Sequence, residues 1–151
     1  MSWAVRPATI EELDDLVEFN LAMAEETEGK RLDSAVLRAG IEQGLRNPAR
    51  ARYFVAEGPT GKAVGSLMLT TEWSDWRNGD FWWIQSVYVH PSARRQGIYS
   101  ALYAEVKRAA RTHNDVIGLR LYVETENSAA QETYQALGMT RCHYFLYEEV
   151  F

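Results

Sequence analysis

Apolar residues in the first part of the chain recur with the period of an α-helix. From residue 13 to 24, leucine, valine and alanine fall on one helical face, and Thr9 with Glu12 forms the T-x-x-E capping box that opens a helix. Residues 2–6 form a short predicted strand before it, which Pro7 ends. This pattern predicts a strand followed by a helix with one apolar face.

A second helix and a group of strands follow. Either Asp33 or Ser34 can cap this helix, and Asn47-Pro48 ends it because the residue before a proline avoids the helical region. After this helix, the sequence pattern changes to short apolar runs separated by turns that contain Gly, Pro and Asn. This pattern predicts an antiparallel meander. Its predicted strands cover residues 52–57, 64–71 and 81–89.

The last part of the chain returns to alternating helices and strands. The predicted elements are a helix with Ile98, Leu102, Val106 and Ala109 on one face, a strand over 117–124, a helix capped by Asn127 or Ser128 with Gly138 at its C-terminal end, and one or two closing strands within 139–150. The element order is β-α-α-β-β-β-α-β-α-β. It predicts an α/β fold with a mixed sheet, in which the strand-helix-strand unit from 81 to 123 is a right-handed parallel crossover.

Composition narrows the class of protein. A length of 151 residues predicts one domain over 1–151, and the formal net charge of −5 argues against nucleic acid as a partner, because phosphate contacts need excess positive charge. No apolar run reaches the ~20 residues of a membrane helix. The single cysteine, Cys142, cannot form an internal disulfide, and the first twelve residues lack the features of a secretory signal. We therefore expect a cytoplasmic protein without membrane partners.

One segment carries the pattern of an anion site. Residues 87–100 read as an apolar strand that ends at His90-Pro91, then a polar loop with Arg94 and Arg95, then Gly97 opening an amphipathic helix. The first backbone N–H groups of a helix lack partners, and the helix dipole adds positive charge there. A glycine lets the backbone approach a phosphate closely. The segment predicts an anion-binding loop, although a solvated loop at a helix start would have the same sequence.

The same loop resembles that of the GNAT superfamily of acyl-CoA-dependent N-acetyltransferases. In this family, the pyrophosphate loop follows a Q/R-x-x-G-x-G/A pattern after a strand, and Arg94, Gly97 and Tyr99 stand at its fixed positions. Tyr99 departs from the pattern, which has Gly or Ala there. Its backbone amide remains available.

A second stretch is similar to the other signature of the family. There, an Asn is followed by an Ala after three residues and a Tyr after seven, and then by a Leu-Gly turn; Asn127, Ala130 and Tyr134 match these positions before Leu137-Gly138. The predicted element order also matches the family, so the resemblance covers essentially the whole chain. It implies the GNAT-type acyl-CoA N-acyltransferase fold, in which two central parallel strands splay apart.

The resemblance implies a cofactor and a mechanism. Acetyl-CoA would lie between the splayed strands, with its pantetheine arm paired to the backbone of the first strand and its pyrophosphate on the loop amides. The amine would attack directly in a ternary complex, with Tyr134 as the general acid or thiolate stabiliser. The residues implied for cofactor binding are Val87, Tyr88, Val89, Arg94, Arg95, Gln96, Gly97, Ile98, Tyr99, Ser100, Asn127, Ala130 and Tyr134.

The acceptor is expected to be the primary amine of a small cationic molecule. Glu25, Glu26 and Glu28 lie near the connection of the first two helices, which forms the acceptor wall in the family, and would attract a cation. Trp82 can contribute a cation–π contact, and Gln85 lies on the strand that faces the cleft. The diamine acetyltransferase branch has paired acids at the position of Gln85, so this chain departs from it. No His or Cys spacing indicates a metal.

Two other functions remain open from the sequence. The chain could be a non-catalytic acyl-CoA-binding or sensing module, because it has no evident general base, or an acetyltransferase of protein N-termini or lysines. Family members are often dimers, so a homodimer is a further expectation.

Overall fold

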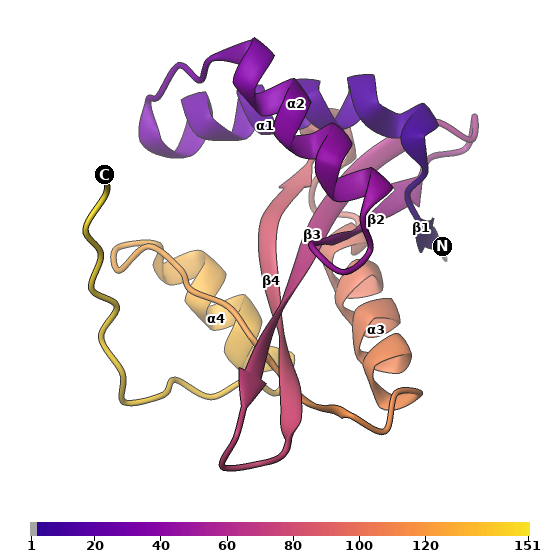
Figure 1. Ribbon diagram of the computed structural model, residues 1–151. Coiled ribbons are helices and arrows are strands. Elements are labelled where there is room, and N and C mark those ends of the chain that lie inside the picture. Colours follow the sequence, from indigo (N-terminus) through magenta and orange to yellow (C-terminus); the bar gives the residue numbers. More distant parts are fainter. Residues whose placement is uncertain (1–2) are drawn as a thin grey trace. The chain divides into compact units, whose positions relative to one another are not determined.

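The computed structural model describes residues 3–151, which divide into two compact units, one up to Leu121 and the other Tyr122–Phe151 (Figure 1). No helix among the described residues has the length and apolar character to span a bilayer. The elements, in chain order, are β1 Ala4–Pro7, α1 Leu13–Glu28, α2 Ser34–Arg46, β2 Arg52–Glu57, β3 Ala63–Ser74, β4 Gly79–Val89, α3 Ile98–Arg111, β5 Val116–Arg120 and α4 Ser128–Ala136, with short 3-10 turns at Ile10–Glu12 and Pro91–Ala93.

The first unit holds a mixed five-stranded sheet in the order β1-β2-β3-β4-β5. Its strands are antiparallel except for β4 and β5, which pair in parallel. This parallel ladder stops at Trp83 and Arg120, so no β5 residue is paired with the second half of β4, from Ile84 to Val89. The α/β class, the mixed sheet and the separation of the two parallel strands are confirmed, although β5 lies at the edge of the described sheet and not at its centre.

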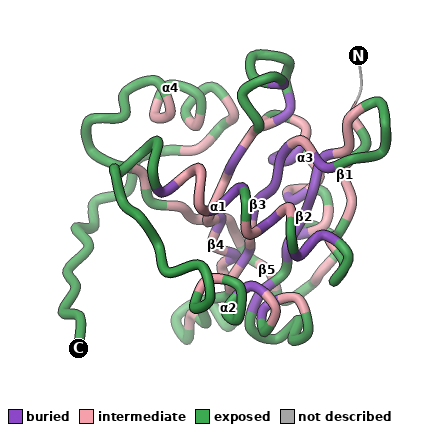
Figure 2. Tube along the Cα trace, turned by 90° about the horizontal axis from the view of Figure 1, so that it is seen from above, coloured by how far each residue is buried: buried purple, intermediate pink, exposed green. Residues whose placement is uncertain are grey.

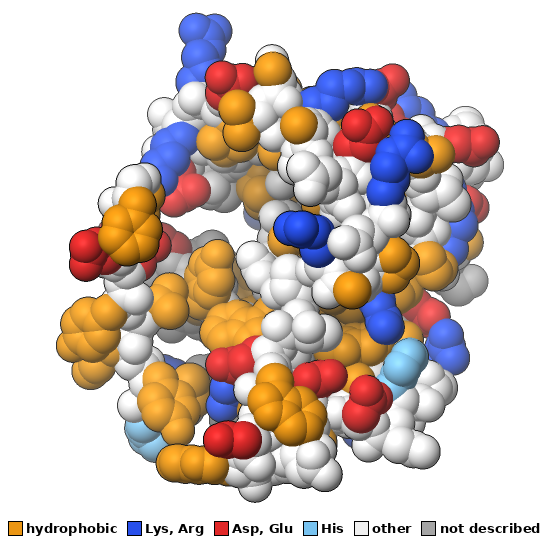
Figure 3. Space-filling view, in the orientation of Figure 1, with side chains coloured by type: hydrophobic (Ala, Val, Ile, Leu, Met, Phe, Trp, Pro, Cys, Tyr) orange, Lys and Arg blue, Asp and Glu red, His pale blue; other side chains and the backbone are white. Residues whose placement is uncertain are grey.

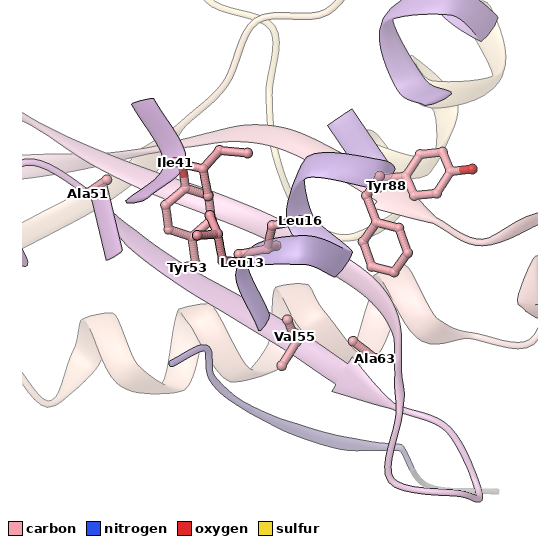
Figure 4. Close-up of a cluster of buried hydrophobic side chains, with 9 residues drawn as sticks. Leu13, Leu16, Ile41, Ala51, Tyr53, Val55, Ala63 and Tyr88 are labelled. Atoms are coloured by element: carbon pink, nitrogen blue, oxygen red, sulfur yellow. The ribbon is translucent and has the colours of Figure 1, made fainter. Parts of the chain in front are cut away.

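Helices cover both faces of this sheet because its inner strands are apolar on both sides. Tyr53 and Val55 of β2 belong to the core cluster that contains Leu13 and Leu16 of α1 (Figure 4). The alternate β2 residues, of which Phe54 is one, point to the other face, which α3 covers. Burial on both faces explains why these strands read as short continuous apolar runs.

The predicted capping box at the first helix is confirmed. The Thr9 side chain accepts a hydrogen bond from the Glu11 amide, and Glu12 Oε2 accepts one from the Thr9 amide at 2.6 Å. Glu12 also pairs with Arg6 of β1, which in turn bonds Glu57 of β2. Burial disfavours the Glu12 carboxylate, but the bonds from Arg6 and Thr9 outweigh it and lower its pKa. This network ties the start of the first helical segment to the edge of the sheet.

The second unit contains α4 and a C-terminal segment. Asn127 caps α4 by accepting a hydrogen bond from the Ala130 amide at 3.1 Å, and Gly138 follows the helix with a φ of +100°, as the sequence predicts. None of the residues of this unit is buried (Figure 2). A stretch of 30 residues without buried side chains has no core of its own.

Of the predictions about the last third of the chain, one is wrong and one is correct only in part. No strand forms within 139–150, because a strand requires a hydrogen-bonded neighbour and none of the five strands of the described chain pairs with this segment. The strand predicted over 117–124 is shorter, Val116–Arg120, because its ladder with β4 ends at Arg120. The N-terminal strand begins at Ala4, and Ser2 of the predicted range lies outside the described residues.

Candidate cofactor and acceptor site

A cavity of about 230 Å³ lies between the end of β4 and the start of α3. It is built entirely from one continuous stretch of the first unit. Seven of the residues expected to bind the cofactor line it, together with Ala93: Val89, Arg94, Arg95, Gly97, Ile98, Tyr99 and Ser100. The sequence pattern that predicted an anion loop therefore corresponds to a real hollow at a helix N-terminus.

The backbone of this loop is arranged to present N–H groups. Arg95 and Gly97 have φ angles of +62° and +80°, so two left-handed residues interrupt the chain just before α3. Within residues 3–151, the structure gives the amides of Gly97, Ile98 and Ser100 no acceptor. Amides without acceptors at a helix N-terminus, next to residues in the left-handed conformation, can form an anion-binding surface.

The conformation of Gly97, and not a lack of room, requires a glycine. A Cβ built at this residue meets no atom within 4 Å, so the space beside it is open. A side chain there is disfavoured because φ is positive, and the open space lets an anion approach the backbone.

Close packing holds the start of α3 against the sheet. Gly65 of β3 lies under the helix, and a Cβ on it would stand 2.9 Å from the Ile98 side chain and 3.2 Å from the Tyr88 carbonyl oxygen. Ile98 and Leu102 are almost completely buried. The position of the amide-bearing turn is therefore set by the core and does not depend on the exposed loop alone.

The charge of the site is positive on balance at the helix start. The first turn of α3 contains no acidic residue that would cancel its dipole, and Arg94 and Arg95 both line the cavity. The Arg94 guanidinium donates from Nε to the Val89 carbonyl oxygen at 2.9 Å and lies over the Tyr88 ring, 5.6 Å from its centroid. A negatively charged ligand would meet both the amides and a held guanidinium.

An irregularity in β4 separates its two halves next to this cavity. The register between β3 and β4 shifts between Ser66 and Met68, and Ser86 on the facing strand has a φ of +52°. Such a bulge bends a strand and changes which way its side chains point. Tyr88, beyond the bulge, is buried against Phe19 of α1 at a ring distance of 5.2 Å, so it forms part of the core. Val87 lies in the half of β4 that has no β5 partner, and it does not line the cavity.

Gln96 is the expected cofactor-binding residue of the 94–100 loop that does not line the cavity. Its side-chain Nε2 donates to the Ser92 carbonyl oxygen at 3.3 Å, and its main-chain carbonyl oxygen accepts a hydrogen bond from Trp3 Nε1 at 2.8 Å. These bonds hold the outer side of the loop.

The expected acceptor residues lie in several environments. Glu26, in the last turns of α1, forms an ion pair with Arg94 at 2.7 Å, and this contact raises the pKa of the Arg94 guanidinium. Glu28 pairs with Lys30 at 3.6 Å in an exposed position, and Glu25 is exposed. Of the three acids, Glu26 therefore connects the first helix directly to the cavity.

Trp82 and Gln85 differ in exposure. Trp82 is only 2% exposed, with Arg52 over its ring and His113 against its edge, so we leave it out of the acceptor site. Gln85 is half-buried and donates from Nε2 to the Thr70 hydroxyl at 2.6 Å. Because β4 residues alternate in direction, Gln85 points to the face opposite that of Trp82.

The remaining predicted residues belong to the second unit. Ala130 and Tyr134 share the half-buried side of α4, and Asn127 stands at its cap. They are therefore held in one helix with the spacing that the family pattern requires. Among the described residues, no three His, Cys, Asp or Glu side chains are grouped as metal ligands.

Sequence reasoning missed two features of the site. Ala93 lines the cavity, but an alanine beside two arginines carries no signal of its own. The pairing of Glu26 with Arg94 joins residues 68 positions apart, and only the packing of α1 near the loop brings them together.

Comparison with known proteins identifies the class. Residues 12–139 match the family model of the acetyltransferase (GNAT) family, and the chain belongs to this family. Its members take their acetyl group from acetyl-CoA, and the chain is an acetyltransferase of this kind. No curated protein matches it.

Solved structures agree with this assignment. A possible acetyltransferase from Clostridium difficile 630 is 42% identical, with a TM-score of 0.92 over 100% of this chain and 99% of that chain. A predicted acetyltransferase with acetyl-CoA from Clostridium acetobutylicum shares the fold at 16% identity, with a TM-score of 0.79 over 97% and 96% of the two chains. AAC(6')-Iy, in complex with the bisubstrate analogue CoA-S-monomethyl-acetylneamine, also shares the fold. It is 19% identical, with a TM-score of 0.77 over 100% of this chain and 99% of that chain.

Proposed function

We propose that this protein transfers an acetyl group from acetyl-CoA to the primary amine of a small cationic acceptor, by direct attack in a ternary complex. The observation that carries the proposal is the cavity at the start of α3, whose free amides and two arginines suit a diphosphate. When bound, acetyl-CoA supplies an acetyl group activated as a thioester.

The chain's own groups fit this cofactor in two ways. The amides of Gly97, Ile98 and Ser100 would hold the diphosphate, with Arg94 and Arg95 balancing its charge. The half of β4 that lacks a β5 partner offers backbone groups to the amides of a pantetheine arm, as an added strand would be held. Val87 and Val89 lie in this half.

Tyr134 is the proposed acid. Its hydroxyl would donate a hydrogen bond or a proton to the departing thiolate. A thiol has a pKa of about 8.5 and a tyrosine about 10, so complete transfer has little driving force. Stabilisation of the thiolate by the hydrogen bond therefore contributes more than proton transfer. We propose that Asn127, seven residues earlier, contacts the cofactor arm near the thioester.

The acceptor must lose a proton before it attacks. An alkylammonium with a pKa of about 10.4 costs about 4.6 kcal/mol to deprotonate at pH 7. Gln85 cannot accept this proton, but it can order a water molecule that carries it away. The acids at the end of α1 would concentrate cationic acceptors near the site.

A glycine substitution tests the cofactor site. In Gly97→Ala, the altered turn should weaken coenzyme A binding by at least about tenfold, because it removes the aligned amides. Gly61→Ala is the matched control: Gly61 has a φ of +83°, and a Cβ there also meets nothing within 4 Å. Both variants should lose a similar ~1 kcal/mol of stability. Isothermal titration with coenzyme A and thermal melting measure the two effects.

Turnover distinguishes an enzyme from a sensor. Thiol release from acetyl-CoA, measured across a panel of small amines and lysine-containing peptides, should identify a small cationic acceptor. Binding of coenzyme A without turnover of any acceptor would favour the non-catalytic module. Failure of the wild type to bind coenzyme A at millimolar concentration would contradict the proposal as a whole.

We also propose that the protein forms a homodimer in the cytoplasm. Large apolar side chains are exposed along the C-terminal segment, among them Phe145, Leu146 and Tyr147, and Figure 3 shows hydrophobic side chains standing out on this part of the surface. Several large exposed apolar side chains in one segment are typical of an interface. The thiol of Cys142 is exposed, which suits a reducing compartment.

A further inference from the structure

Two residues expected to bind different substrates are bound to each other. Arg94 lines the cavity proposed for the diphosphate, and Glu26 belongs to the group proposed for the cationic acceptor. Their side chains form an ion pair in which Arg94 Nη2 lies 2.7 Å from Glu26 Oε2. The diphosphate would therefore compete with Glu26 for Arg94, and the ammonium group of the acceptor would compete with Arg94 for Glu26.

The Arg94 side chain is held in place by more than this pair. Its Nε donates to the Val89 carbonyl oxygen, and its guanidinium lies over the Tyr88 ring. These contacts keep the group at the border of the cavity when Glu26 is not bound. A guanidinium has five N–H donors, and a phosphate can accept two of them in parallel.

The ion pair itself is weak enough to exchange. Both side chains are more than 40% exposed, and exposed pairs contribute little net stability because water and salt screen them. A diphosphate beside Arg94 carries more negative charge than one carboxylate and offers more acceptor oxygens. The balance of attraction therefore favours the diphosphate once it occupies the cavity.

We propose that Arg94 exchanges Glu26 for the diphosphate when coenzyme A binds, and that the released Glu26 carboxylate then anchors the ammonium group of the acceptor. This inference rests on the proposed function. Before exchange, Glu26 is paired and attracts a cation poorly. After exchange, its charge is uncompensated, so the cofactor increases the affinity for the acceptor, and by linkage the acceptor increases the affinity for the cofactor.

The direction in which one substitution changes the affinity for coenzyme A tests the exchange. Glu26→Gln removes the competitor of the diphosphate and should tighten coenzyme A binding by about three- to tenfold in isothermal titration at low ionic strength. Glu18→Gln removes an equal charge from an exposed position on the same helix and should change the affinity by less than about twofold. If Glu26 instead only positioned Arg94 for the cofactor, Glu26→Gln would weaken binding, and this result or an unchanged affinity would overturn the proposal.

A double-mutant cycle separates exchange from simple repulsion. In the Arg94→Gln background, adding Glu26→Gln should change coenzyme A affinity by less than about twofold, because the shared group is gone. An equal gain in both backgrounds would overturn the proposal, since it would mean that Glu26 acts on the diphosphate directly. Far-ultraviolet circular dichroism and thermal melting check that each variant is folded.

Kinetics test the acceptor half. At saturating acetyl-CoA, Glu26→Gln should raise the KM of a cationic acceptor by at least about fivefold and leave kcat within about threefold, because an ammonium anchor contributes binding and not chemistry. An unchanged KM would overturn this half. Failure of the wild type to bind coenzyme A would instead contradict the proposed function, so the two failures are distinguishable.

Discussion

The two units of this chain differ in how their candidate functional residues are supported. In Met1–Leu121, the cavity is backed by buried side chains on both sides of a five-stranded sheet. In Tyr122–Phe151, α4 presents Asn127 and Tyr134 from a unit with no buried residue. The first unit has a buried core behind its loop, whereas no residue of the second unit is buried.

This difference indicates a division of tasks. A diphosphate site gains from fixed amides, because donors that are already aligned need no reordering when the ligand binds. A proposed acid on α4 needs only a correct position while the substrates are bound. The part of the cofactor site built by the first unit is therefore expected to survive changes in the second unit.

The largest expected difference between the units concerns stability. Leu16 is fully buried, so Leu16→Ala should lower the free energy of unfolding by about 2–5 kcal/mol. Leu146 of the second unit is 70% exposed in the single chain, so at a protein concentration at which the chain is monomeric Leu146→Ala should change the free energy of unfolding by less than about 0.5 kcal/mol. Urea denaturation of both variants measures the contrast. A cost of several kcal/mol for Leu146→Ala would mean that the C-terminal segment is covered in solution.

The next effect separates chemistry from binding. Tyr134→Phe should lower kcat by about 10- to 100-fold, because it removes the proposed hydroxyl donor at the thiolate. Coenzyme A affinity and melting temperature should stay near those of the wild type, since the cavity belongs to the first unit. A loss of less than tenfold in kcat, with coenzyme A binding intact, would remove Tyr134 from the mechanism.

A smaller effect concerns pH. The pKa of Glu12 is lowered in the folded state, so its bonds add stability above the unfolded pKa of about 4.3 and lose this contribution as the pH falls through the folded value. Glu12→Gln should cost about 1–3 kcal/mol at pH 7. The difference from wild type should shrink below about pH 4. Denaturant unfolding between about pH 3 and pH 7, a range that brackets the titration of Glu12, measures this difference. A difference that stays constant with pH would argue against the network.

Much of the fold could be predicted from local chemistry. Thr9 and Glu12 cap the first helix, Asn127 caps α4, and Gly97 opens α3 in a left-handed conformation, each as its residue type predicts. These features depend on neighbouring residues alone. The failure over 139–150 has the opposite cause: an apolar, aromatic stretch favours a strand, but strand formation depends on a partner that the sequence does not name.

The anion loop could be predicted because its function depends on backbone conformation and on residues close in sequence. The pattern from Arg94 to Ser100 therefore carried enough information to locate the cavity. The burial of Trp82 and the pairing of Glu26 with Arg94 could not be predicted in this way. Both depend on which elements pack together, and the same residue types would be equally suited to an exposed acceptor site.

The amino-acid sequence by itself determined the order of the elements up to α4, the helix caps and the position of the anion loop, because these follow from interactions within a few residues. Only the tertiary structure decided where β5 separates from β4, which aromatic side chains are buried and which partner each charged group has. Those outcomes depend on contacts between distant segments, whose free energies are set by packing and by the loss of water, and not by residue type alone.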